Sequence, residues 1–183
     1  HNAIKELYKR LNNTKICYIV DADIKGFFDH MKHEWIIKFL NLYIKDPNII
    51  GLVKKYLKVG VLDGGELMMN EEGSAQGNII LANIYMHNVL TLWYKFIITK
   101  ECKGDNFLIV YADDFVAGFQ FKWEAENYYK LLKERMEKFG LQLEESKSRL
   151  LQSGAYIARA KQKSGESTRL ETFDFLGFTF YCG

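Results

Sequence analysis

The sequence predicts an α+β fold in which an antiparallel sheet, built around one β-hairpin, packs on helices. Residues 107–119 hold two apolar, strand-like runs separated by a short stretch that contains Asp113 and Asp114, as in a tight hairpin. A second apolar run, residues 16–20, is also followed directly by aspartates, in Asp-Ala-Asp at residues 21–23. The segments between and around these strands carry apolar residues at helical spacing.

Hydrophobic periodicity defines the helices in chain order. They are expected at residues 3–11, 31–43, 47–58, 78–99 and 124–139. One face of the second helix is expected to carry Trp35, Ile36, Phe39, Leu40 and Tyr43. Pro47 suits the first turn of the third helix, for which Asp46 is the expected N-cap.

The remaining strands are short. Residues 63–65, Asp-Gly-Gly, lie between apolar runs and predict a β-hairpin over residues 59–69. Further strands are expected at residues 149–151 and 175–180. Residues 146–170 carry six cations against one anion, which fits a stripe along a phosphate backbone and equally a solvated loop.

Composition limits the class of protein. A chain of 183 residues with 48% apolar content can bury one sizeable core, and its single proline and 26% charged residues are typical of a globular protein. No apolar run approaches the roughly 18–20 residues of a membrane span, so no membrane contact is expected. A net charge of +2 does not by itself indicate nucleic-acid binding. The three scattered cysteines predict reduced thiols in a cytosolic protein: Cys17, Cys102 and Cys182.

The aspartates at the strand ends are candidate metal ligands. Period-2 alternation places Asp21 and Asp23 on one face of their strand. Taken alone, Asp113 and Asp114 could be ordinary turn residues, but carboxylates at two strand ends need a cation wherever they are buried. If the fold brings the two ends together, they form a site for two Mg²⁺ ions roughly 3.5–4 Å apart.

Five motifs follow one another along the chain. They are Asp-Ile-Lys-Gly-Phe-Phe-Asp at 23–29, Gly-Ser-Ala-Gln-Gly at 73–77 with Leu-Ala-Asn-Ile-Tyr at 81–85, Tyr-Ala-Asp-Asp at 111–114, Gly-Leu-Gln-Leu-Glu-Glu-Ser-Lys at 140–147, and Phe-Asp-Phe-Leu-Gly-Phe at 173–178. Together they resemble the palm of a reverse transcriptase, and more narrowly the bacterial group II intron reverse transcriptase/maturase family. Each motif alone is weak, but their shared order across almost the whole chain is specific.

The resemblance implies an RNA-directed DNA polymerase that uses two Mg²⁺ ions to transfer deoxynucleotides to a primer 3′-hydroxyl. Its implied partners are an RNA template, a DNA or RNA primer, deoxynucleoside triphosphates and a group II intron RNA whose splicing and mobility it assists; a homodimer is left open. Residues 1–15 and 31–77 would belong to or adjoin the fingers, and residues 16–30 and 78–183 would form the palm. Upstream fingers, thumb and maturase domain are expected outside this chain, and the expected location is the bacterial cytoplasm.

The resemblance also assigns roles to single residues. The implied metal ligands are Asp23, Asp113, the auxiliary Asp114 and the backbone carbonyl of Ile24. Asp21 is expected to make a structural hydrogen bond instead. Lys147 matches the lysine that protonates the pyrophosphate leaving group, a step typically worth roughly 10²–10⁴-fold in rate. The turn that grips the primer end is matched by Leu176, Gly177 and Phe178.

The nucleotide site is implied to follow the first acidic strand. Lys25 and the backbone amides of Gly26 and Phe27 would cradle the triphosphate, as successive amides in a turn do. Phe28 matches the bulky steric gate that leaves no room for a ribose 2′-hydroxyl, which assigns Phe27 to the core. The pair that backs the incoming nucleotide and template is matched by Gln76 and Gly77.

The match departs from the family in one region. Ala75 stands where the family usually has proline, and only residues 78–80 separate Gly77 from Leu81, about three fewer than usual. Three alternatives are consistent with the sequence. One is a retron, diversity-generating or CRISPR-associated reverse transcriptase; another is a non-catalytic RNA-binding maturase scaffold; the third is a palm-fold nucleotide cyclase, which shares the acidic hairpin.

Overall fold

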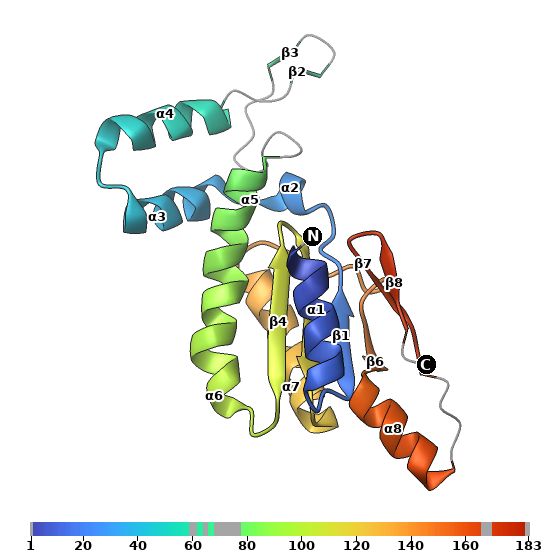
Figure 1. The fold of residues 1–183 in the computed structure, drawn as a ribbon. Helices are drawn as coiled ribbons and strands as arrows, with labels where there is room; N and C mark the ends of the chain where they lie inside the picture. Colours follow the sequence, from blue (N-terminus) through green and yellow to red (C-terminus); the bar gives the residue numbers. More distant parts are fainter. Residues whose placement is uncertain (1, 59–61, 64–65, 68–77, 166–169, 182–183) are drawn as a thin grey trace.

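A four-stranded antiparallel sheet with the strand order β4-β5-β1-β6 forms the centre of the molecule in the computed structural model (Figure 1). The structure describes residues 2–58, 62–63, 66–67, 78–165 and 170–181. The sheet strands are β1 (Tyr18–Ala22), β4 (Asn106–Tyr111), β5 (Asp114–Phe119) and β6 (Arg149–Gln152). With helices on both sides of this sheet, the predicted α+β fold is confirmed.

The other elements surround the sheet. The α-helices are α1 (Asn2–Asn13), α2 (Phe27–His30), α3 (His33–Tyr43), α4 (Pro47–Lys58), α5 (Ile79–Met86), α6 (Thr99–Glu101), α7 (Lys122–Lys138) and α8 (Ala155–Ser164). Two π-helical stretches are η1 (His87–Thr91) and η2 (Tyr94–Ile98). Two separate hairpins are formed by β2 (Leu62–Asp63) with β3 (Glu66–Leu67) and by β7 (Phe173–Phe175) with β8 (Phe178–Phe180).

Each face of the sheet packs against its own hydrophobic cluster. Because side chains alternate along a strand, Ala22 and Phe115 lie in one cluster, together with buried residues of α5 and α7. Ile19 and Val116 lie in the other, together with buried residues of α1 and β7. The sheet therefore separates α5 and α7 on one side from α1 and the β7–β8 hairpin on the other.

The predicted helices are present, with ends shifted by a few residues and the short α2 added. Asp46 caps α4 as predicted, since its side chain accepts a 2.8 Å hydrogen bond from the Asn48 amide. On the predicted apolar face of α3, Ile36, Phe39 and Leu40 are buried and Trp35 packs against the same core cluster. Tyr43, in the last turn, is 59% exposed, and its hydroxyl donates a 3.4 Å hydrogen bond to the Asn88 side chain of η1.

The predicted long helix over residues 78–99 is present, but two stretches of it are π-helical. π-Helical turns are rare and occur frequently at functional sites. In η1, the Arg135 guanidinium of α7 donates a 2.8 Å hydrogen bond to the Val89 carbonyl. Hydrophobic periodicity does not distinguish π-helical turns from a regular α-helix, so they could not be predicted from the sequence.

Two C-terminal elements differ from the prediction. Residues 146–170, for which a solvated loop was one of two expectations, contain helix α8, which has no buried residue and therefore little apolar periodicity to reveal it. The single strand predicted over 175–180 is a hairpin instead. Leu176 and Gly177 both have positive φ, 51° and 76°, which is the backbone of a two-residue hairpin turn.

The smaller predictions have mixed outcomes. Strands β2 and β3 pair as the predicted hairpin, while its central Gly64 and Gly65 lie outside the described residues. Cys17 and Cys102 are free thiols as predicted, and Cys182 is not among the described residues. No helix in the described part of the chain has the length and apolarity to cross a membrane.

Candidate active site

The sheet register brings the two acidic strand ends together. Ala22 of β1 and Phe115 of β5 form the last pair of their ladder, so Asp23 and Asp114 are the next residues in the same antiparallel order. Asp113 lies in the two-residue turn between β4 and β5. Three carboxylates from distant parts of the sequence therefore gather at one end of the sheet.

The turn that carries Asp113 is strained. Ala112, its other residue, has a φ of 54°, which residues with a Cβ adopt rarely and at a cost of order 1–3 kcal/mol. The Ala112 side chain is also buried, which favours a small residue at this point. The strained φ of Ala112 allows the turn to have only two residues. Asp113 therefore lies in the turn, and Asp114 is the first residue of β5.

Backbone contacts hold Asp23 in place just after β1. The Asp23 carbonyl accepts a 2.8 Å hydrogen bond from the Glu144 amide, and the Lys25 amide donates to the Gln142 carbonyl at 2.9 Å. These bonds flank an isolated bridge between Ile24 and Leu143. In that pattern Ile24 is a non-hydrogen-bonded position, so the bridge does not use its carbonyl.

Two cations from the chain after α7 face the aspartates of β1. The Lys147 ammonium lies 3.2 Å from Asp23 Oδ2, and the Arg149 guanidinium lies 3.5 Å from Asp21 Oδ2. Arg149 is directly opposite Asp21 in the β1–β6 register. The expectation that Asp21 has a structural partner is therefore confirmed, and the partner is Arg149.

The site carries excess negative charge around Asp114. Partial burial raises the pKa of the Asp114 carboxyl, and the charges of Asp113 and Asp23 raise it further. Partial burial also raises the pKa of Asp21, although the adjacent Arg149 acts in the opposite direction. The carboxylates at this end of the sheet thus disfavour one another when no metal is bound.

This repulsion predicts that Asp114 destabilises the metal-free protein at neutral pH. With a raised pKa, the native state holds its proton more tightly than the unfolded state, so the free energy of unfolding falls as pH rises through that pKa. In EDTA at pH 7, Asp114→Asn should raise Tm by roughly 1–2 °C, and the gain should vanish below pH 3.8. Thermal denaturation followed by circular dichroism measures this, with Glu134→Gln on α7 as the control. A lower Tm for Asp114→Asn would contradict it.

A cavity of about 380 Å³ opens beside these groups. Its lining combines both acidic strand ends, the turn that carries Lys147, and the β7–β8 hairpin: Asp21, Ala22, Asp23, Asp114, Phe115, Ser146, Lys147, Arg149, Asp174, Phe175 and Leu176. Residues from four of the five sequence motifs therefore line one cavity. Arg149 and Asp174 were not predicted as part of it, although the β1–β6 register explains the position of Arg149.

The β7–β8 hairpin is anchored by its first strand. Phe173 and Phe175 are buried against the α1 face of the sheet, and Phe173 stacks on Phe180 with ring centroids 5.3 Å apart. The turn residue Leu176 lines the cavity, whereas the Phe178 side chain is exposed. The turn is thus joined to a strand that packs in the core, and it faces the same cavity as Asp23 and Asp114.

The carboxylates fit Mg²⁺ by donor type. No group of three or more His, Cys, Asp or Glu side chains forms a ready metal cluster among the residues that the structure describes. However, carboxylate oxygens are the preferred ligands of Mg²⁺, and a divalent cation would relieve the repulsion around Asp114. Asp23, Asp113 and Asp114 would hold the ion, after Lys147 gives up its contact with Asp23 Oδ2.

The segment predicted to bind nucleotide forms a tight turn into α2. Gly26 has a φ of 52°, and Lys25 and Gly26 are exposed beside the end of β1. Phe27 is buried edge-on against Tyr85, with ring centroids 6.1 Å apart, as expected for a core residue. Phe28 is only partly buried, so it is the ring of this pair that reaches the surface. Two predicted nucleotide contacts lie outside the described residues: Gln76 and Gly77.

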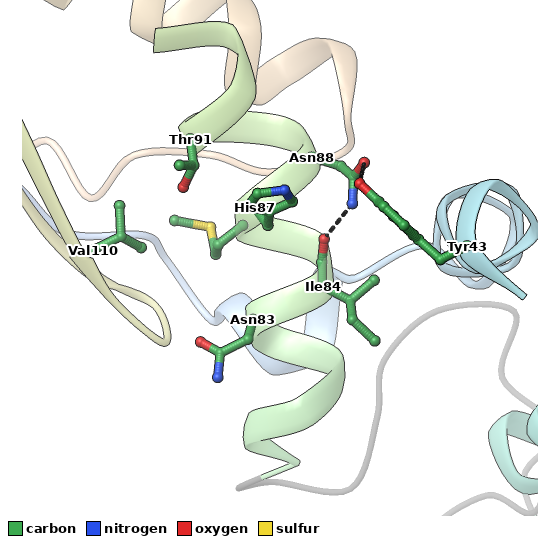
Figure 2. Close-up of a pocket in the computed structure, with 8 residues that line it drawn as sticks. Tyr43, Asn83, Ile84, His87, Asn88, Thr91 and Val110 are labelled. Atoms are coloured by element: carbon green, nitrogen blue, oxygen red, sulfur yellow. Dashed lines mark hydrogen bonds between the residues drawn. The ribbon is translucent and has the colours of Figure 1, made fainter. Parts of the chain in front are cut away.

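A second cavity, of about 450 Å³, contains none of the predicted site residues. Figure 2 shows Asn83 and His87 along one helix, Val110 of β4 across from them, and Tyr43 of α3 on the other side. Val110 packs on the cluster that contains α5 and α7, so the sheet separates this cavity from the carboxylates.

Comparisons with known proteins agree with this geometry. Residues 2–180 match the profile of a family described as reverse transcriptase (RNA-dependent DNA polymerase). The chain is 34% identical over 108 residues to the group II intron-encoded protein LtrA of Lactococcus lactis subsp. cremoris, which covers 57% of this chain and 17% of LtrA. It is 28% identical over 93 residues to protein YkfC of Escherichia coli (strain K12), which covers 48% of this chain and 24% of YkfC. The chain thus spans only a small part of the length of these relatives.

A solved structure shares the fold. The apo telomerase from Candida tropicalis matches with a TM-score of 0.66 at 15% sequence identity. The match covers 99% of this chain and 32% of the telomerase chain. At this identity the likeness supports the fold alone.

Proposed function

Because the chain belongs to the reverse transcriptase family, we propose that it is the catalytic palm of an RNA-directed DNA polymerase. One observation carries this proposal: Asp23, Asp113 and Asp114 meet at one end of the sheet, next to a cavity that the β7–β8 hairpin also lines. A degenerate palm that served only as a scaffold would have no need to keep three mutually repelling carboxylates.

The proposed reaction is attack of a primer 3′-hydroxyl on the α-phosphate of a deoxynucleoside triphosphate. Bound Mg²⁺ would neutralise the attacking and leaving oxygens. Asp23 and Asp113 would hold the metal, with Asp114 and the Ile24 carbonyl in support. Lys147 then lies on the leaving-group side and donates a proton to the departing pyrophosphate.

The remaining predicted residues position the substrates. The Lys25 side chain and the amides of Gly26 and Phe27 bind the triphosphate, and Phe28 excludes a ribose 2′-hydroxyl. Gln76 and Gly77 support the incoming nucleotide against the template. The primer end rests on the hairpin turn formed by Leu176, Gly177 and Phe178.

The proposed wider role rests on the similarity to LtrA. LtrA is by name a group II intron-encoded protein. We propose that the present protein likewise acts on a group II intron RNA, as polymerase in intron mobility and as helper in splicing. Its template is accordingly RNA, held through backbone shape and phosphate contacts rather than through base sequence. A cytoplasmic location among nucleic acids follows from this role.

Primer extension tests the proposal. The natural-length protein, an annealed RNA template, Mg²⁺ and dNTPs should give extension, and rNTPs should give far less. Asp113→Ala should abolish extension, whereas Asp105→Ala, an exposed aspartate just before β4, should extend normally. If the protein binds the RNA but extends no primer, it is an RNA-binding scaffold and the polymerase proposal fails.

A further inference from the structure

The cations of residues 146–170 fall into two separate places. Lys147 and Arg149 pair with the aspartates of β1 at the catalytic end of the sheet. Strand β6 then runs antiparallel to β1, away from Asp23, and α8 begins three residues after β6 ends. Figure 1 shows α8 at the opposite end of the sheet from the β4–β5 turn. The cations of α8 therefore cannot serve the catalytic cavity.

One side of α8 is basic and carries an exposed ring. Tyr156, Arg159 and Lys163 are spaced three and four residues apart, which places them on one stripe of the helix, and all three are exposed. Tyr156 is 46% exposed. Residues 155–164 contain no Asp or Glu, so no charge within the helix offsets these cations.

The neighbouring helix α1 repeats this pattern. Helices α1 and α8 contact each other, and α1 exposes Lys5, Tyr8 and Lys9 on one side. Tyr8 is 67% exposed. The one acidic residue of α1, Glu6, lies 2.7 Å from the Arg10 guanidinium and is thereby neutralised. We call the six residues Lys5, Tyr8, Lys9, Tyr156, Arg159 and Lys163 the α1–α8 surface.

Helix stability accounts for only part of this arrangement. Lys163 lies in the last turn of α8, where a cation complements the helix dipole. Arg159 lies in the middle of the helix, and Tyr8 and Tyr156 gain nothing from the dipole. Cations that follow a phosphate backbone, interspersed with aromatic rings on which bases stack, are the combination that binds single-stranded nucleic acid.

We propose that the α1–α8 surface is a second RNA-binding site, which holds an unpaired RNA segment outside the catalytic cavity, since none of its six residues lines that cavity. Lys5, Lys9, Arg159 and Lys163 contact the phosphates, and the two tyrosines stack on bases. The proposal rests on the proposed function in one respect, that the protein acts on RNA. It adds a site where RNA outside the primer–template duplex is held during synthesis.

The test uses the natural-length protein with its catalytic cleft filled by an excess of unlabelled primer–template duplex. Binding of a fluorescent single-stranded RNA of about a dozen nucleotides is then measured by anisotropy at several salt concentrations. Arg159→Gln/Lys163→Gln should lower the slope of log K against log[salt] by roughly 1.4, since each lost contact to a single strand removes roughly 0.7. Tyr156→Ala should weaken binding by roughly tenfold, and Tyr156→Phe should restore it.

Matched controls separate this site from general charge and from catalysis. Lys100→Gln/Lys130→Gln removes two exposed cations from α6 and α7, outside the α1–α8 surface, and should leave both affinity and salt slope unchanged. All variants should extend primers at the wild-type rate. Unchanged RNA binding in the α8 variants would overturn the inference, as would equal competition by double-stranded RNA. If the wild type extends no primer but the α8 variants still lose RNA binding, this inference stands and the polymerase proposal fails.

Discussion

Replacing Asp23 with asparagine is expected to reduce the rate of primer extension by roughly 10³-fold or more. Metal-ion catalysis supplies several kcal/mol of transition-state stabilisation, and each 1.36 kcal/mol corresponds to about a factor of ten in rate. Asp23 is a proposed ligand of both metals, so the loss of its charge should remove most of that stabilisation. A neutral amide oxygen of the same size does not replace it.

The substitution should leave the fold intact, because Asp23 is positioned by its backbone. Its carbonyl accepts a 2.8 Å hydrogen bond from the Glu144 amide, and its amide donates to the Ser148 hydroxyl at 3.3 Å. Neither contact involves the carboxylate. The side-chain ion pair with Lys147 is mostly exposed, so its loss should change stability little.

Single-turnover primer extension across a Mg²⁺ titration measures the effect, and thermal denaturation checks the fold. Asp21→Asn is the matched comparison, because Asp21 lies two residues earlier and lines the same cavity but pairs with Arg149. Its rate should fall by less than about tenfold. If Asp21→Asn were inactive and Asp23→Asn active, the assignment of metal ligands would be reversed.

The sequence predicts the acidic strand ends well because the signals there are local and strong. One apolar run ends in Asp21 and Asp23, and two others flank Asp113 and Asp114. This pattern predicts strands with acidic ends. The pairing of β1 with β5 then places these ends side by side. Asp23 and Asp114 become neighbours only through this strand register, which could not be predicted from the sequence.

What the sequence could not predict depends on tertiary contacts. Helix α8 has no buried face, so its residues resemble a polar loop. The turn at Leu176 places a leucine at positive φ, where propensity favours glycine or asparagine, and this conceals the hairpin. The ion pair of Asp23 with Lys147 depends on a bridge between Ile24 and Leu143, which the motifs that carry these residues do not encode.

Lys147 provides the second large effect. Lys147→Gln is expected to lower the rate of the chemical step by roughly 10²–10⁴-fold, the usual range for a lost general acid. A turn holds this lysine in place: the Lys147 amide donates to the Glu144 carbonyl at 3.0 Å, and Lys133 pairs with Glu145 at 2.9 Å. The side chain is nevertheless largely exposed, so the substitution should not disturb the fold.

The metal dependence should distinguish Lys147 from the metal ligands. In the present structure the Lys147 ammonium is 3.2 Å from Asp23 Oδ2, where it competes with a metal for that oxygen. Lys147→Gln removes this competitor. The Mg²⁺ concentration for half-maximal rate should therefore stay the same or fall, whereas for Asp23→Asn it should rise. Rapid-quench extension over a Mg²⁺ titration gives both values.

Arginine at position 147 separates proton donation from simple attraction. Arginine keeps the positive charge but does not release a proton in proteins, so Lys147→Arg can attract the leaving phosphate without protonating it. If Lys147 acts as a general acid, Lys147→Arg should recover less than about a tenth of the lost rate. Lys133→Gln, which breaks only the neighbouring ion pair with Glu145, should keep most of the rate. Full recovery with arginine would instead assign Lys147 a purely electrostatic role at the triphosphate.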